Sequence, residues 1–258
     1  MKKKKLIQSI QRASDILDLF IQEKRALGVT DFSTRMDLPK TTVSSIVQTL
    51  LELRYLERDP LTSRYRLGPK LFQLGMKYAT NMDLVLVARA WMERLCFQFR
   101  QPVNVGMMVG DKAVVVLRVE PENRLMVFPQ AGSVIPFHTS AIGKVLFAHL
   151  SPEKRGAILD GYDFQRLTER TIGNADDFIA ELGRVRREGI AFDDQESVTG
   201  LTCVGAPIYN NRGQVIAAFS VTGKSENIER QRERIINVMR YAGTQISAQM
   251  GYRSAALG

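Results

Sequence analysis

Two helical segments joined by a three-residue turn constrain the fold of this chain more than any other feature. The first covers about residues 31–35, the turn covers residues 36–38, and the second begins near Pro39. Proline suits that place because its fixed φ and missing N–H are tolerated in a first helical turn. Apolar residues then recur at helical spacing along one face: Val43, Ile46, Val47, Leu50 and Leu51. This periodicity predicts a helix-turn-helix.

A two-stranded ribbon is predicted directly after the second helix. Residues 55–58 and 64–67 flank Asp59-Pro60-Leu61-Thr62-Ser63, a composition typical of a tight turn. A helix-turn-helix followed by such a ribbon is a winged helix-turn-helix. An ordinary helical hairpin with a β-ribbon is the alternative interpretation.

The face of the second helix opposite the apolar stripe is small, polar and almost uncharged. It comprises Lys40, Thr41, Thr42, Ser44, Ser45 and Gln48. Hydroxyl and amide groups on such a face reach base edges or phosphates when the helix lies in a major groove of double-stranded DNA. We therefore expect this face to read DNA, with Lys40, Arg64 and Arg66 binding the phosphate backbone and the ribbon entering an adjacent minor groove.

The distribution of charge supports a DNA partner. Residues 1–80 carry 15 Lys and Arg against 8 Asp and Glu, whereas residues 81–258 carry 21 against 19. Nearly all of the net charge of +9 therefore lies on the segment with the helix-turn-helix, as phosphate contacts require. The basic run Lys2–Lys5 is either a solubilising tail or a further backbone contact.

Length and composition indicate a two-domain globular protein. A chain of 258 residues is long for a single core, and its 45% hydrophobic content is ordinary for a globular fold. No apolar run approaches the roughly 20 residues that span a bilayer, and the N-terminus lacks the features of a secretory signal. Cys96 and Cys203 are too few for a disulfide framework, so we expect a protein of the reducing cytoplasm.

The rest of the chain mixes helices and strands. Apolar spacing predicts a first helix over about residues 7–21, a helix that opens at Pro69 and continues past Asp83 to Phe99, and later helices over 140–150, from 151, over 176–187 and over 228–250. Strands are expected at 103–109, 113–119, 124–129, 190–193, 203–209 and 215–221. This pattern predicts an α+β fold, with a mostly antiparallel sheet that has helices on one face and cradles a small ligand.

Both halves of the chain resemble the IclR family of bacterial transcriptional regulators. The strings that carry the resemblance are LPKTTVSSIVQTLLEL, YLERDP and RYRLGPKLFQLG, then PFHTSAIGKVLFAHL (136–150), IAFDDQESVTGLTCVGAPIYN (190–210) and VIAAFSVTG (215–223). The resemblance implies a winged helix-turn-helix domain (1–69), a linker helix (70–82) and a GAF-like effector-binding and oligomerisation domain (83–258). It also implies homodimers or homotetramers on a palindromic operator, and a small-molecule effector that alters DNA occupancy. Half-sites would then lie about 10 base pairs apart, or a multiple of that spacing.

Two positions depart from the family pattern. The family commonly has Arg where this chain has Ser45, which removes a strong phosphate or guanine contact and predicts a different operator or weaker binding. The family has Gly between the second helix and the ribbon, where this chain has Arg54. Glycine there would adopt the left-handed conformation that caps the helix. Arginine adopts this conformation only at a cost in conformational energy, but it adds a positive charge near the DNA backbone.

The resemblance also implies where the effector binds. The expected residues are Leu125, Met126, Ser140, Ala141, Ile142, Asp193, Cys203, Ser220 and Thr222. The free N–H groups at the start of the helix at 140–142 would receive a carboxylate, and Leu125 or Met126 would form an apolar wall. Such a pocket suits a small acid or a hydroxylated aromatic compound. Asp193 would have to accept a hydrogen bond from a ligand hydroxyl or be protonated.

Each of these residues also has a simpler interpretation. Cys203 in an apolar strand is equally a small buried hydrophobe. Ser220 and Thr222 alternate with apolar residues and would face solvent in an ordinary strand. Asp193 is also a common turn residue. Glu196 would bond the backbone of its own loop, and Lys144 is structural or solvated.

Enzymatic and metal-binding readings are weak. Only His138 and His149 are present, and the chain contains no HExxH, CxxC or GxSxG motif. A hydrolase that uses Cys203 and His138 would need an oriented third group and an oxyanion site, which no spacing suggests. Metal binding by His138, Cys203 and an acidic side chain stays open, and we expect no catalytic residues and no cofactor. The principal alternative to a regulator is a sensor or interaction module that no longer reads DNA, for which Ser45 is the best argument.

Overall fold

The computed structural model divides the chain into two compact units, residues 1–81 and residues 82–258. It describes residues 6–23, 25–80, 83–122 and 129–253. None of the helices in these ranges combines the length and the hydrophobicity that a span of the lipid bilayer requires.

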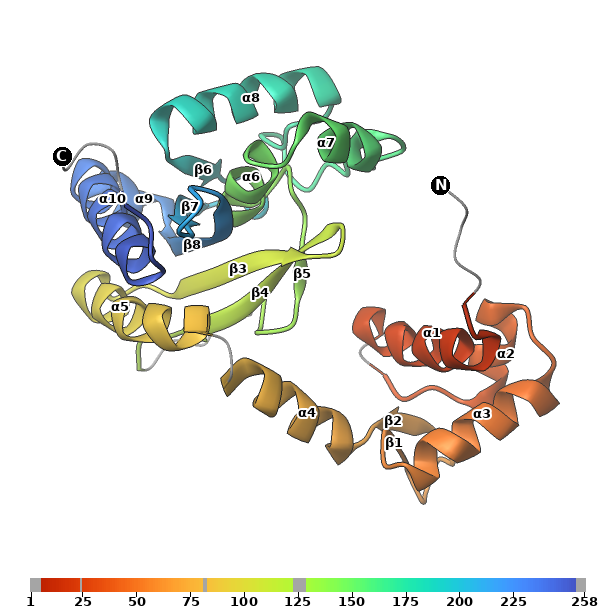
Figure 1. The fold of residues 1–258 in the computed structure, drawn as a ribbon. Coiled ribbons are helices and arrows are strands. Elements are labelled where there is room, and N and C mark those ends of the chain that lie inside the picture. The colour runs from red at the N-terminus through yellow and green to blue at the C-terminus, as the bar shows by residue number, and fades with distance from the viewer. Residues whose placement is uncertain (1–5, 24, 81–82, 123–128, 254–258) are drawn as a thin grey trace. The chain divides into compact units, whose positions relative to one another are not determined.

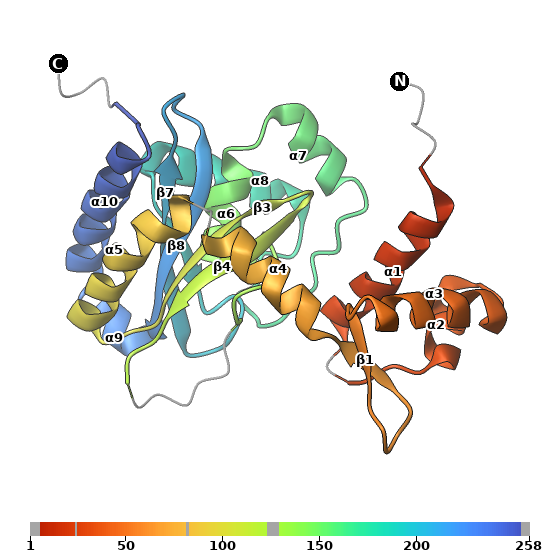
Figure 2. The same cartoon turned by 60° about the horizontal axis from the view of Figure 1, so that its bottom comes forward.

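In the first unit, α1, α2 and α3 pack around one core beside a two-stranded wing, and α4 follows the wing (Figure 2). Its elements are α1 (Gln8–Gln22), α2 (Val29–Met36), α3 (Lys40–Glu52), β1 (Leu56–Arg58), β2 (Tyr65–Leu67) and α4 (Pro69–Thr80). The predicted stripe of α3 packs inward, with Val43, Val47 and Leu50 buried against Phe32 of α2. The turn between α2 and α3 begins at Asp37, which has a left-handed φ of 51°. The winged helix-turn-helix predicted from the sequence is confirmed.

Helix α3 ends in a left-handed cap at Arg54. The residue has a φ of 60°, its N–H donates to Leu51 O at 2.9 Å, and the next N–H, from Tyr55, donates to Leu50 O at 2.9 Å. These two bonds form a Schellman motif, which glycine usually closes. Arg54 therefore adopts the left-handed conformation that was expected at this position.

The wing is closed by the side chain of Asp59. Strands β1 and β2 pair antiparallel, with Leu56 opposite Leu67. At the tip, Asp59 Oδ1 accepts hydrogen bonds from the N–H groups of Leu61 and Thr62, both at 2.9 Å. These bonds hold the pKa of Asp59 below its ordinary value, because they favour the ionised carboxylate.

The second unit is built on a six-stranded antiparallel sheet in the order β5-β4-β3-β8-β7-β6 (Figure 1). The strands are β3 (Val103–Val109), β4 (Lys112–Val119), β5 (Val134–Ile135), β6 (Ala191–Asp194), β7 (Leu201–Tyr209) and β8 (Val215–Lys224). Strands β3 and β4 form the predicted hairpin through Gly110, whose φ is 62°. The strand expected at 124–129 falls almost entirely outside the described residues.

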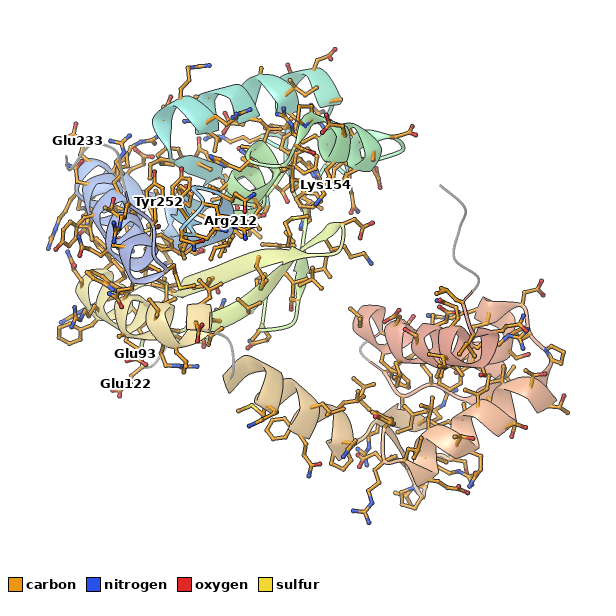
Figure 3. All side chains as sticks on the ribbon, viewed as in Figure 1. Glu93, Glu122, Lys154, Arg212, Glu233 and Tyr252 are labelled. Atoms are coloured by element: carbon orange, nitrogen blue, oxygen red, sulfur yellow. The ribbon has the colours of Figure 1, made fainter. Side chains whose placement is uncertain are left out.

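Helices cover both faces of this sheet, so the expectation of helices on one face is wrong. Helices α5 (Asp83–Phe99), α9 (Ser225–Glu229) and α10 (Arg232–Gln249) lie on one side, and α6 (Ala141–Ala148), α7 (Pro152–Leu159) and α8 (Ala175–Glu188) lie on the other (Figure 1). Strand β8 shows the reason, because Phe219 and Val221 join the core under α5 and α10 while Ala218 joins the core under α6. Both faces of a central strand are apolar and must be covered. Side chains fill both layers (Figure 3).

One long helix expected from the sequence is interrupted in the structure, and the continuity of a second falls on residues outside the described ranges. The helix expected over 228–250 is divided into α9 and α10, with Arg230 and Gln231 between them. The helix expected from Pro69 to Phe99 is described as α4 and α5, and residues 81–82 between them lie outside the described ranges.

Candidate functional site

The polar face of α3 is accessible in the first unit. Lys40, Thr41, Ser44, Ser45 and Gln48 are exposed, and Thr42 is half-buried. The hydroxyl of Ser45 donates to Thr41 O at 3.1 Å, so it bonds to its own helix. A hydroxyl in this arrangement still has a lone pair that can accept a hydrogen bond.

Both arginines expected to bind phosphates have partners within the first unit. Arg64 Nη1 lies 2.9 Å from Asp31 Oδ2 and 3.1 Å from Ala26 O, and Arg66 Nε lies 2.8 Å from Glu57 Oε1. Arg64 thereby ties the wing to the start of α2, a structural role that the sequence did not reveal. A guanidinium has five N–H donors, so each arginine keeps donors for a phosphate.

A cavity of about 190 Å³ lies in the second unit beside the start of α6. All seven described residues of the expected effector site line it: Ser140, Ala141, Ile142, Asp193, Cys203, Ser220 and Thr222. Leu125 and Met126 lie outside the described residues. The lining also includes residues that sequence reasoning missed: Asn104, Val115, Ile135, Thr139, Leu167, Ser197, Val198 and Leu201.

Two glycines allow the start of α6 to lie close to the sheet. A Cβ at Gly106 of β3 would lie 2.7 Å from Ile142 Cγ2, and a Cβ at Gly205 of β7 would lie 3.0 Å from the backbone of Ala141. Any larger residue at either position would push the helix away. The glycines therefore place the first turn of α6 over the middle of the sheet.

The cap of α6 engages the hydroxyl of Ser140 both as a donor and as an acceptor. Ser140 Oγ accepts from Gly143 N at 3.0 Å and donates to Pro136 O at 2.6 Å. A Cβ at Gly143 would lie 2.6 Å from the same carbonyl oxygen, so this tight turn needs glycine. The N–H groups of Ala141 and Ile142, at the first two helical positions, have no acceptor within the helix.

The carboxylate of Asp193 is already surrounded by donors of the chain. Oδ1 accepts from Glu196 N at 2.8 Å and Ser197 N at 3.2 Å, and Oδ2 accepts from the hydroxyl of Ser197 and from Cys203 Sγ at 3.5 Å. Burial raises the pKa of Asp193, although these bonds oppose the shift. Asp193 lines the cavity as expected, but its contacts hold the loop that follows β6.

Cys203 and Thr222 continue this chain of bonds. Thr222 Oγ1 donates to Cys203 Sγ at 3.2 Å, and the two residues face each other across β7 and β8. Burial raises the pKa of Cys203 well above its ordinary value, so the thiol stays protonated and unreactive. The thiol therefore acts as a link in a polar network at one end of the cavity.

Lys144 is buried in an ionic cluster behind the cavity wall. Its Nζ lies 2.6 Å from Glu196 Oε1, 2.8 Å from Phe192 O and 3.5 Å from Glu181 Oε1. Burial raises the pKa of Glu196 to about 7, against the opposing effect of Lys144. Lys144 is structural, which was one of the two interpretations of this residue. The side chain of Glu196 binds Lys144, so the expectation that Glu196 bonds the backbone of its own loop is wrong.

The structure does not support the hydrolase that would use Cys203 and His138. Both ring nitrogens of His138 are engaged, Nδ1 with the Tyr162 hydroxyl at 3.0 Å and Nε2 with Gln165 O at 3.1 Å. Burial lowers the pKa of His138, which keeps the ring neutral at physiological pH. Within the described ranges, no three His, Cys, Asp or Glu residues are grouped as a metal ion would require.

Comparison with known proteins places both units in one family. The IclR helix-turn-helix domain model matches residues 9–60, and the model named Bacterial transcriptional regulator IclR C-terminal matches residues 76–248. The HTH-type transcriptional regulator XynR of Escherichia coli K12 is 31% identical, over 96% of this chain and 98% of XynR. The regulator KdgR of the same organism is 30% identical, over 95% of this chain and 94% of KdgR.

Solved structures share the fold over nearly the whole chain. An IclR transcriptional regulator from Alicyclobacillus acidocaldarius matches with a TM-score of 0.84 and 22% identity, over 96% of this chain and 100% of that one. An IclR homologue from Microbacterium hydrocarbonoxydans, crystallised with 4-hydroxybenzoate, matches with a TM-score of 0.80 and 23% identity, over 94% of this chain and 99% of that one.

Proposed function

The chain belongs to the IclR family of bacterial transcriptional regulators, and from this premise we propose that a small carboxylic acid or hydroxylated aromatic compound controls its occupancy of a palindromic operator. The protein is a DNA-binding, effector-responsive regulator and not an enzyme, as its family and relatives are. The proposal adds the chemistry of the effector, the residues that bind it and the symmetry of the operator. We place this activity in the cytoplasm, where DNA is accessible and Cys96 and Cys203 stay reduced.

One observation carries the effector proposal: the start of α6 opens onto a partly open, mostly apolar cavity whose lining includes the hydroxyl groups of Ser220 and Thr222. The unpaired N–H groups and the helix dipole at Ala141 and Ile142 favour a bound carboxylate. The volume of about 190 Å³ lies below the roughly 300–1,000 Å³ of sites for drug-sized ligands, so the effector is small. The relative that binds 4-hydroxybenzoate provides a suitable probe.

The operator proposal depends on a symmetric oligomer. Helix α4 exposes Phe72 and Leu74, and α1 exposes Ile10, apolar side chains that a subunit contact would cover. A two-fold dimer presents two α3 helices to half-sites about one DNA turn apart. We propose that α4 is the linker through which the effector state of the second unit reaches α3. By analogy with the repressor AllR, 28% identical to this chain, we propose repression as the outcome.

The experiment is in vitro selection from random DNA at moderate salt with three proteins: the unchanged chain, Thr42→Ala, and Thr244→Ala on the exposed side of α10. We expect one palindrome to be enriched, specificity to relax only with Thr42→Ala, and 4-hydroxybenzoate to change affinity for the selected site. Absence of enrichment would instead support a sensor that has lost sequence reading, the alternative that Ser45 favours.

A further inference from the structure

Asn104 is a buried amide at the edge of the cavity whose orientation is determined by its neighbour. It lies on β3, is 7% exposed and lines the cavity. Arg118 lies opposite Asn104 on the neighbouring strand β4, and its Nη1 donates to Asn104 Oδ1 at 3.1 Å. A guanidinium can only donate, so the oxygen of the amide must face Arg118 and the nitrogen must point away.

The amide orientation is rigidly supported. Arg118 has a side chain only 5% exposed, is paired with the carboxylate of Glu120, and donates to Pro129 O at 3.3 Å. The Nδ2 of Asn104 has no hydrogen-bond partner in the described part of the chain. This nitrogen is not one of the fully buried atoms that lack a partner, so its N–H groups are accessible and can donate to a ligand.

Three other polar side chains of the cavity already form hydrogen bonds within the chain. Ser140 caps α6, Asp193 accepts four donors, and the hydroxyl of Thr222 donates to Cys203. Ser220 lies on β8, directly opposite Asn104 of β3, and its side chain has no hydrogen bond among the described residues. The buried hydroxyl of Thr139, which also lines the cavity, has no hydrogen-bond partner there either, so recognition of a polar ligand group is concentrated on Asn104, Ser220 and Thr139.

Asn104 also lies close to the expected position of a ligand carboxylate. Gly106, two residues along the same strand, lies against Ile142 at the start of α6. Two residues of an antiparallel strand span about 7 Å, and successive side chains on one face are neighbours at this spacing. A carboxylate bound by the N–H groups of Ala141 and Ile142 is thus within reach of the Asn104 amide.

We propose that Asn104, oriented by Arg118, is a specificity-determining residue that donates a hydrogen bond to the effector carboxylate and thereby selects ionised acids over neutral analogues. This inference rests on the proposed function, because it assumes that a small carboxylic acid occupies the cavity. Arg118 acts only as a positioning residue.

The test compares an acid with its neutral analogue by calorimetry on the full-length protein. The probes are 4-hydroxybenzoate and 4-hydroxybenzamide, and the variant is Asn104→Asp, which keeps an acceptor for Arg118. Loss of a charge-assisted bond predicts about 10- to 100-fold weaker binding of the acid. The amide of the second probe can donate to the new carboxylate, so its affinity is retained or improved and the preference between the probes reverses.

Two further variants separate the amide from general effects. Asn210→Asp makes the same charge change in the turn between β7 and β8, away from the cavity lining, and we expect an unchanged preference. Asn104→Ser removes the amide without adding charge, and we expect a larger loss of affinity for the acid than for the neutral probe, because the bond to an ionised acceptor is the stronger one.

The outcomes distinguish this inference from the proposed function. If the unchanged protein binds neither probe at millimolar concentration, the proposed effector class is rejected, and the inference with it. If the acid binds but both Asn104 variants keep the original preference, only the inference is overturned. An equal loss in Asn210→Asp would likewise overturn it, because the effect would then be long-range charge.

Discussion

Replacing Arg54 with glycine should stabilise the first unit. Arg54 has a φ of 60° in the Schellman motif that ends α3, and two backbone bonds of 2.9 Å hold this geometry. A left-handed conformation costs a residue with a Cβ roughly 1–2 kcal/mol. Glycine removes that cost but gains about 0.4–1 kcal/mol of conformational freedom in the unfolded chain. The net gain should be about 0.5–1 kcal/mol.

The assay must follow the first unit separately. Hydrogen exchange of the α3 amides reports its opening, and a gain of this size corresponds to a melting temperature higher by roughly 2–8 °C for a unit of this length. The single tryptophan, Trp91, lies in the second unit, so its fluorescence should be unchanged and provides an internal control.

Arg54→Ala separates strain from charge. Alanine removes the guanidinium but keeps the Cβ, so it should not gain the stability that glycine gains. If Arg54 also neutralises a phosphate, both variants should lower the slope of log affinity against log salt by about 0.9. Equal stability of the glycine and alanine variants would refute the strain argument.

Three further changes test the second unit. Burial raises the pKa of Glu196 from 4.5 to about 7, so between these pH values the folded state keeps a proton that the unfolded chain releases. The free energy of unfolding should therefore fall as pH rises from about 4.5 to 7. Glu196→Gln should remove this pH dependence in urea titrations. Gly143→Ala places a Cβ 2.6 Å from Pro136 O and should lower stability by about 1–3 kcal/mol and weaken effector binding, whereas normal calorimetry would contradict the cap geometry. Phe178→Ala, at a fully buried site under α6, should cost about 3–5 kcal/mol in urea unfolding, and a loss below 1 kcal/mol would show that the core repacks.

The first unit could be predicted almost completely from the sequence. Its helices are short-range features, in which the spacing of Val43, Val47 and Leu50 determines the buried face. The left-handed cap at Arg54 was expected because the family that the chain resembles has glycine at this position. Local patterns do not show long-range partners, so the ion pair of Arg64 with Asp31 was missed.

The second unit required the tertiary structure. The sequence by itself indicated five of the six strands of the described sheet, but not β5, and it indicated the start of α6 through local periodicity. The resemblance to the family indicated part of the cavity lining. Helices on both faces, the orientation of Asn104 by Arg118 and the saturated carboxylate of Asp193 were decided only in three dimensions. The physical reason is that contacts between distant segments depend on strand register, helix packing and burial. These pair residues far apart in the chain, such as Lys144 of α6 and Glu196 after β6.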